Sequence, residues 1–219
     1  MRRMKADVPF ISDARLEAMA DALLAAAVAK GIGIQLPIPV EAIAERVLDL
    51  DMDWIDLDDP NVMARLNYSE WKIQPNESLR DFFERVPGAY RYTLAHEIFH
   101  AIEHVEHIDQ SQQTLDLVAE TLLPRRRTRP QAPTPNESRR ELQAQHFAAY
   151  LTMPKALLLA KIEGLDLCNR AVLRRLAGDI GVSLQALKIR LQSLGRLYET
   201  PDGRLYPSKE IAHGQLPLL

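Results

Sequence analysis

The chain has 219 residues, of which 47% are hydrophobic and 26% are charged. This composition is ordinary for a globular protein with one domain and an appendage, or two small domains, and it excludes a disordered chain. The 27 Lys and Arg against 30 Asp and Glu give a net charge of −3, which argues against a protein that coats nucleic acid or an anionic membrane. The single cysteine, Cys168, excludes an internal disulfide and any multi-cysteine zinc or iron–sulfur site.

The chain shows no segment typical of secretion or membrane insertion. The basic start would suit a signal peptide, but Asp7 and Asp13 arrive before an apolar stretch can form. The most apolar stretch, residues 18–40, is interrupted by charges, glycines and prolines. We therefore expect a cytoplasmic protein.

The first part of the chain predicts two helices followed by short strands. Apolar residues at helical spacing predict a helix over 13–30, with Ser12 or Asp13 as its cap, and a second helix from about Pro39. The period then changes to alternation at residues 50–54. Further short strands are expected at 62–66 and 71–74, which together make a small antiparallel sheet of about three strands.

The second part of the chain is predicted to be helical. A short helix through Phe82 and Phe83 precedes a long helix over 90–106. Four prolines and four arginines in residues 124–136 indicate an exposed loop. The remaining predicted elements are helices at 137–151 and 154–163, two helices around Gly181 within 169–194, and a terminal hairpin at 196–207.

The strongest motif is His96-Glu97-Ile98-Phe99-His100. Two histidines four residues apart lie on one face of a helix, about 6 Å apart along its axis, so both imidazoles can bind one zinc ion. Glu97 is placed to take the proton of the attacking water in peptide hydrolysis. The alternative is a structural helix that carries the pattern by chance. His104 and His107 lie too far along the helix to bind the same ion and are expected at the surface or behind the ligands.

A third ligand must come from another segment, and the best candidate is the predicted helix over 137–151. Its small buried face would allow close packing against the motif helix, and Glu141 lies on nearly the same side. Glu137 is the rival, one helical turn earlier. Either glutamate could instead be a helix-start residue favoured by the helix dipole. Spacing does not choose between them.

Two separated segments resemble the ImmA/IrrE family of zinc metallopeptidases. Residues 91–100, Arg-Tyr-Thr-Leu-Ala-His-Glu-Ile-Phe-His, are similar to that family's R-F-T-L-A-H-E-L-G-H, and residues 141–154 are similar to its E-x-x-A-N-x-F-A-A-x-L-L-M-P. The resemblance spans about residues 10–195. It implies a zincin-like fold, zinc bound by His96, His100 and Glu141 with Mn²⁺ as a substitute, and Glu97 as the catalytic base.

The chain departs from the family pattern at two positions. Phe99 replaces the usual glycine, so a large side chain must find room there. Gln145 replaces an asparagine or aspartate that could orient a ligand histidine. The reaction also needs a donor for the developing oxyanion. The candidates near the motifs are Tyr92, His104, His146 and Tyr150, and the sequence does not choose among them.

The C-terminal segment suggests a helix-turn-helix, with Gly181 at the turn and Ser183 as the second cap. Its excess of basic residues over Asp179 could contact phosphates, or could face solvent while the helices pack on the peptidase; the second interpretation is preferred. These basic residues are Arg170, Arg174, Arg175, Lys188, Arg190 and Arg196. The arginines at 125–129 suit a solvated loop, with docking of an acidic partner or self-cleavage as alternatives.

The sequence therefore predicts an α+β, mostly α fold. A zincin-like metallopeptidase domain is expected over residues 1–163 and a helical extension with a terminal hairpin over 164–219. The predicted function is intracellular peptide hydrolysis, and the resemblance implies a limited cut in a helix-turn-helix repressor that triggers a stress or mobile-element response. The alternative is a non-catalytic, metal-containing regulator that binds a protein partner or DNA. No membrane partner is expected.

Overall fold

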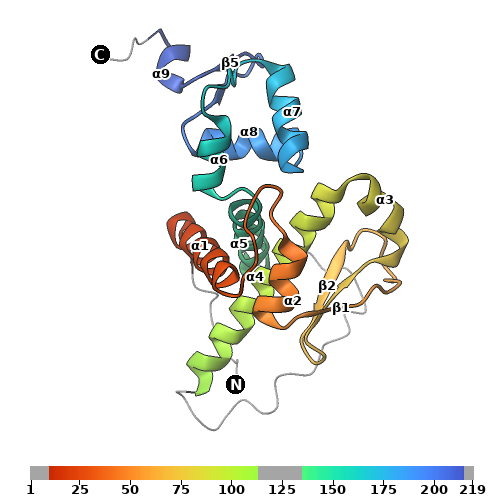
Figure 1. The fold of residues 1–219 in the computed structure, drawn as a ribbon. Helices are drawn as coiled ribbons and strands as arrows, with labels where there is room; N and C mark the ends of the chain where they lie inside the picture. Colours follow the sequence, from red (N-terminus) through yellow and green to blue (C-terminus); the bar gives the residue numbers. More distant parts are fainter. Residues whose placement is uncertain (1–9, 113–134, 215–219) are drawn as a thin grey trace.

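A computed structural model describes residues 10–112 and 135–214 of the chain (Figure 1). The predicted α+β, mostly helical fold is confirmed. Helices α1, α2, α4 and α5 lie together with a small sheet at one side, and α6 to α9 form a second group of elements at one end of the molecule. Within the described ranges, no helix combines the length and the apolar character needed to cross a membrane.

The first two helices follow the sequence pattern closely. Helix α1 (Asp13–Ala29) begins after Ser12, whose Oγ accepts a hydrogen bond from the Arg15 backbone N–H at 3.3 Å. Helix α2 (Val40–Leu48) begins after Pro39 and ends where Asp49 adopts the left-handed conformation. Both helices bury one apolar face in the main core, as the predicted periodicity requires.

The sheet has three strands, β1 (Asp51–Met52), β2 (Ala64–Asn67) and β3 (Lys72–Pro75), in the order β1-β3-β2. Strands β2 and β3 form an antiparallel hairpin, but β1 pairs with β3 in parallel. The expected purely antiparallel sheet is therefore wrong, and the sheet is mixed. The connection from β1 to β2 carries the chain past β3, and alternation of apolar residues contains no information on strand direction.

Two long helices cross the middle of the fold. After the 3-10 turn η1 (Glu77–Leu79) and helix α3 (Arg80–Arg85), helix α4 (Pro87–Gln112) starts at a proline, three residues before the predicted start. Helix α5 (Pro135–Thr152) packs against α4 and α1. The predicted loop over 124–136 lies almost wholly outside the described residues.

The C-terminal elements are α6 (Lys155–Ile162), α7 (Arg170–Ile180), α8 (Leu184–Ser193), β4 (Tyr198–Glu199), β5 (Leu205–Tyr206) and α9 (Lys209–Ala212). Gly181 ends α7 in the left-handed conformation and Ser183 caps α8, as predicted. Strands β4 and β5 pair as the expected hairpin, whereas α9 is not indicated by the sequence pattern.

The turn between α7 and α8, at Gly181, contacts the start of α4. A Cβ built on Gly88 would lie 2.2 Å from the carbonyl oxygen of Gly181, so only glycine fits there. Three residues later, Arg91 donates a hydrogen bond to the same carbonyl oxygen at 3.1 Å. The α7–α8 turn and the first turn of α4 are thus in direct backbone contact.

The buried side chains form two hydrophobic clusters. The larger one joins α1, α2, the sheet, α4 and α5, and the second is built mainly by α6, α7 and α8. Helix α6 contributes Leu158 and Ile162 to the second cluster, so this core starts before residue 164. The division of the chain into domains at 163/164 stays a prediction.

Candidate metal centre

The packing of α4 on α5 creates the candidate site. Helix α5 presents a fully buried face of small and apolar side chains to the core, consisting of Ala144, Phe147, Ala148 and Leu151. Phe99 of α4 is fully buried as well, and its ring centroid lies 5.6 Å from that of Phe147. The large side chain that replaces glycine in the family pattern therefore fills space between the two helices.

The three predicted ligands lie together. His96 Nε2 is 3.1 Å from Glu141 Oε2 and 3.2 Å from His100 Nε2, and His100 Nε2 is 3.6 Å from Glu141 Oε1. One potential ligand atom from each residue falls within 4.8 Å of the others. Glu137 is not part of this group, so the geometry favours Glu141 over its rival.

The group is open to solvent on one side. The side chains of His96 and His100 are 17% and 13% exposed, whereas that of Glu141 is 55% exposed. Two nearly buried imidazoles with an exposed carboxylate leave room for a further ligand from solvent. This is the arrangement of a catalytic rather than a closed structural metal site.

The protonation of the ligands suits a cation. Burial lowers the pKa of His100 because the charged imidazolium is poorly solvated there. The hydrogen bond with His96 lowers the pKa of Glu141. A neutral imidazole and an ionised carboxylate are the forms that bind a metal ion.

The ligand atoms also indicate which metal ion the site fits. Two imidazole nitrogens and one carboxylate oxygen are a common ligand set of catalytic zinc, and the absence of any thiolate excludes sites that need soft sulfur ligands. The described residues at this site therefore fit a zinc ion held by His96, His100 and Glu141.

Glu97 lies beside this group but points to the sheet. Its carboxylate is buried, and the backbone N–H of Leu66 in β2 donates a hydrogen bond to it. Burial is the main reason that its pKa rises to about 7; neighbouring His96 lowers it and Glu141 raises it. A carboxyl group with a pKa near neutrality can both accept and return a proton, which is what a general base in this position requires.

A second pair of residues links the ligand helices. Arg140 Nε donates to Glu103 Oε1 at 3.0 Å, and the Glu103 side chain is almost fully buried. Glu103 lies one turn after His100 on α4, and Arg140 immediately precedes Glu141 on α5. The sequence reasoning missed this pair, although the position of Glu103 three residues after His100 is a signal that could have been tested.

The other predicted residues are distributed around the site. Tyr92 donates to the backbone carbonyl of Gln145 at 3.0 Å, and the exposed Gln145 side chain makes no hydrogen bond among the described residues. The predicted orienting role of Gln145 is therefore not seen. His146 Nδ1 lies 2.7 Å from Asp13 Oδ1. His104 contacts the ring of Tyr68, and the side chain of His107 lies outside the described residues.

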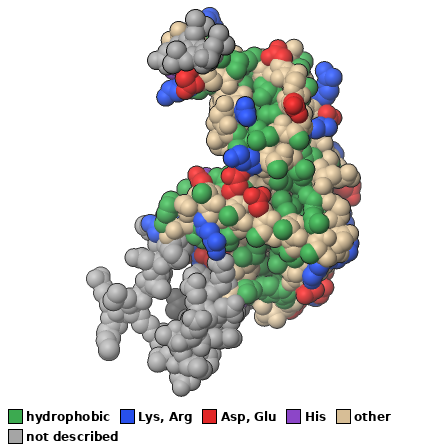
Figure 2. All heavy atoms as spheres, turned by 60° about the vertical axis from the view of Figure 1, so that its left-hand side comes forward, with side chains coloured by type: hydrophobic (Ala, Val, Ile, Leu, Met, Phe, Trp, Pro, Cys, Tyr) green, Lys and Arg blue, Asp and Glu red, His purple; other side chains and the backbone are tan. Residues whose placement is uncertain are grey.

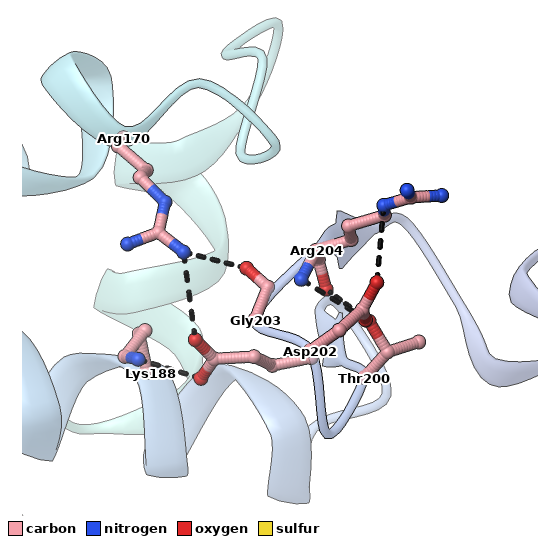
Figure 3. Close-up of polar contacts among 7 residues, drawn as sticks. Arg170, Lys188, Thr200, Asp202, Gly203 and Arg204 are labelled. Atoms are coloured by element: carbon pink, nitrogen blue, oxygen red, sulfur yellow. Dashed lines mark hydrogen bonds and ion pairs between the residues drawn. The ribbon is translucent and has the colours of Figure 1, made fainter.

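Several basic residues of the C-terminal helices are engaged within the protein. Arg190 is only 3% exposed; it donates to the Met153 carbonyl and pairs with Glu17 of α1. Figure 3 shows Lys188 and Arg170 directed to the C-terminal hairpin, where Lys188 Nζ lies 2.5 Å from Glu199 Oε2. Arg170 also donates to the Gly203 carbonyl at 2.5 Å. These three cations are therefore unavailable as a phosphate-binding row.

The surface view agrees with this. On the face drawn in Figure 2, blue Lys and Arg side chains alternate with red Asp and Glu, and no continuous basic patch is visible.

Comparison with known proteins agrees with the fold and the site. Residues 86–192 match the model of the IrrE N-terminal-like domain, Peptidase_M78, in agreement with the resemblance to the ImmA/IrrE family. The matched residues include His96, Glu97, His100 and Glu141 and extend through most of α8. The helical fold and the His96, His100 and Glu141 group both agree with this domain match.

A solved structure, a Mycobacterium tuberculosis transcriptional regulator, is similar in fold, with a TM-score of 0.54 and 15% sequence identity. The likeness covers 90% of this chain but only 55% of that protein, so this chain spans about half of its length. No curated protein matches the sequence.

Proposed function

We propose that this protein is a zinc-dependent cytoplasmic endopeptidase that makes a limited cut in a helix-turn-helix transcriptional repressor. The observation that carries the proposal is the convergence of His96, His100 and Glu141 within 4.8 Å, with the buried Glu97 beside them. The match to the Peptidase_M78 domain supports a peptidase over a structural helix that carries the motif by chance.

The residues have separate tasks. His96, His100 and Glu141 would hold the ion and leave a position open to solvent. Zinc in such a site lowers the pKa of water and polarises a peptide carbonyl. Glu97 accepts the proton of the attacking water and returns it to the leaving amine, for which a pKa near 7 is suited.

The sheet offers a place for the substrate chain. Strand β2 lies at one edge of the three-stranded sheet, and the hydrogen bond between Leu66 and Glu97 places this strand directly beside the candidate base. An extended peptide can add to such an edge as a further strand. This mode favours a flexible linker between folded parts of a repressor over a folded segment.

The first test distinguishes an endopeptidase from a regulator that has no catalytic activity. The purified protein with zinc or manganese is incubated with a purified helix-turn-helix repressor, and the products are analysed by mass spectrometry. We expect two defined fragments, which are absent with Glu97→Gln. Broad degradation of casein at a comparable rate would contradict a limited regulatory cut.

The alternative is a non-catalytic regulator that binds a protein or DNA and keeps the metal for structure. The similar fold of a transcriptional regulator favours testing it. It predicts that Glu97→Gln acts like the wild type in every assay and that the repressor remains intact.

A further inference from the structure

The proposed reaction needs a hydrogen-bond donor for the carbonyl oxygen that becomes negative when water adds. Three of the four side chains considered from the sequence, Tyr92, His146 and Tyr150, have other partners, and the fourth, His104, packs against the ring of Tyr68. Tyr92 donates to the carbonyl of Gln145, and both His146 and Tyr150 hydrogen-bond to Asp13. The ring of Tyr150 also lies under the Arg190 guanidinium, 4.6 Å from the centroid. The hydrogen-bonding groups of these three side chains are therefore already engaged within the protein.

Tyr68 lies close to the carboxylates of Glu97 and Glu141, and within residues 10–112 and 135–214 its hydroxyl has no hydrogen-bond partner. It follows Leu66 by two residues, and the Leu66 N–H bonds to the carboxylate of Glu97. On its other side, its ring centroid is 4.4 Å from that of His104, one turn after His100 on α4. The contact with His104, together with the electrostatic influence of the Glu97 and Glu141 carboxylates on the phenol, places the Tyr68 ring near the face of α4 that carries the histidines.

The turn that carries Tyr68 is well anchored. Asn67 Oδ1 accepts hydrogen bonds from the backbone N–H of Ser69 at 3.2 Å and of Glu70 at 3.3 Å. At the other end of the turn, Trp71 donates its indole N–H to the Leu48 carbonyl at 2.8 Å. A side chain on a fixed turn can meet a reacting group with little loss of entropy.

The Tyr68 side chain is 48% exposed, so a substrate can reach it. Among the residues that the structure describes, its hydroxyl makes no hydrogen bond. Burial of part of the phenol raises its pKa, and the carboxylates of Glu97, Glu103 and Glu141 act in the same direction, while Arg140 opposes them. The hydroxyl therefore keeps its proton at neutral pH and is a donor.

We propose that Tyr68 is a catalytic residue that donates a hydrogen bond to the oxyanion formed from the scissile carbonyl. The inference rests on the proposed peptidase function and names a group of that same site. Its basis is the position of Tyr68 on the fixed turn two residues after Leu66, its ring contact with His104, and the absence of a hydrogen bond to its hydroxyl within the described ranges.

The step is balanced without any further reactant. The water oxygen forms a bond to the carbonyl carbon, the π pair moves onto the carbonyl oxygen, and the water proton passes to Glu97. The oxygen pair then re-forms the carbonyl, the C–N bond breaks, and the amine leaves with the proton from Glu97. Tyr68 keeps its own proton throughout and stabilises the charged oxygen in between.

The test compares Tyr68→Phe with Tyr92→Phe, which removes a hydroxyl of the same kind that is already bonded to a backbone carbonyl. We expect Tyr68→Phe to lower kcat on the order of 100-fold with KM and bound metal nearly unchanged, as for loss of one oxyanion donor. Tyr92→Phe should keep kcat within about threefold of the wild type. Equal kcat for Tyr68→Phe and the wild type would overturn the proposal.

A binding measurement provides a second readout that does not depend on turnover. A phosphinic dipeptide carries a tetrahedral, negatively charged centre, and its affinity for the zinc-loaded protein can be measured by calorimetry. We expect at least tenfold weaker binding by Tyr68→Phe and no change for Tyr92→Phe; equal affinities for Tyr68→Phe and the wild type would also overturn the role. If the wild type cleaves no repressor but the binding difference is present, the proposed substrate is wrong and the role of Tyr68 stands.

Discussion

Arg140 Nε donates a hydrogen bond to Glu103 Oε1 over 3.0 Å, and this pair joins the two helices that carry the candidate ligands. The contact lies one residue before Glu141 and one turn after His100. It therefore fixes the distance between the carboxylate on α5 and the imidazoles on α4. Residues that orient ligands in this way commonly change metal affinity when they are replaced.

Replacement of Glu103 by glutamine should weaken metal binding about tenfold, because Arg140 loses its charged partner and Glu141 is held less firmly. Titration calorimetry with zinc measures the effect. The matched control is Glu77→Gln, which breaks the exposed pair with Arg80 far from the site. Zinc affinity of Glu103→Gln equal to that of the control would show that the pair has no orienting role.

The assignment of the third ligand can be tested with two alanine variants. Glu141→Ala should lose bound metal, because it removes the only carboxylate in the group, and Glu137→Ala should retain it. Elemental analysis of protein purified without chelator gives the metal content. Metal loss by Glu137→Ala alone would place the ligand one helical turn earlier than we infer.

The raised pKa of Glu97 predicts a pH-dependent stability of the metal-free protein. The folded state holds the proton up to about pH 7, whereas the unfolded chain releases it near 4.5, the ordinary pKa of a glutamate. Stability from this group is therefore present below pH 4.5 and is lost as the pH rises to about 7, by about 3 kcal/mol for a shift of this size.

Glu97→Gln has no charge to bury, so its stability relative to the wild type should increase over the same pH interval. Urea unfolding in the presence of a chelator between pH 4.5 and 8 measures the difference. A difference that is independent of pH would mean that the Glu97 carboxylate is solvated in the folded protein.

Replacement of Arg190 should strongly destabilise the protein. Its guanidinium is buried against Glu17, the Met153 carbonyl and the Tyr150 ring, so it ties α8 to α1 and α5. Arg190→Ala should cost about 3 kcal/mol in the free energy of unfolding, because it leaves Glu17 without its partner and opens a cavity. Chemical denaturation provides the measurement, and the exposed Arg174→Ala should remain within about 0.5 kcal/mol of the wild type. A similar effect of both variants would contradict the structural role.

The helices of this fold could be predicted because each has an apolar face repeated at helical spacing, as Leu16 and Ala20 illustrate in α1. The direction of β1 could not, because alternation in Leu50, Met52 and Trp54 is the same for parallel and antiparallel pairing. The hairpin partner of β2 was predictable from its short turn.

The candidate ligands could be predicted in part from spacing. His96 and His100 follow from the four-residue interval, but the choice of Glu141 needed the family resemblance, since spacing alone left Glu137 equal. Tyr68 and Arg140 gave no signal, because their roles depend on which side chains meet when the sheet and α5 pack on α4. From the sequence, Arg190 was grouped with the other basic residues of the C-terminal helices, because a pattern of charges does not show which of them are buried.

The contact between Gly88 and the carbonyl of Gly181 gives the molecule a route for communication. Gly88 precedes His96 on the same helix by eight residues, or about 12 Å along the axis. A helix is stiff along its axis, so a displacement at one end is felt at the other. A partner that binds α7 and α8 and displaces their turn would therefore act on the helix that carries the imidazoles. Gly88 and Arg91 both meet the Gly181 carbonyl, so the α7–α8 turn is mechanically tied to the helix that carries His96 and His100.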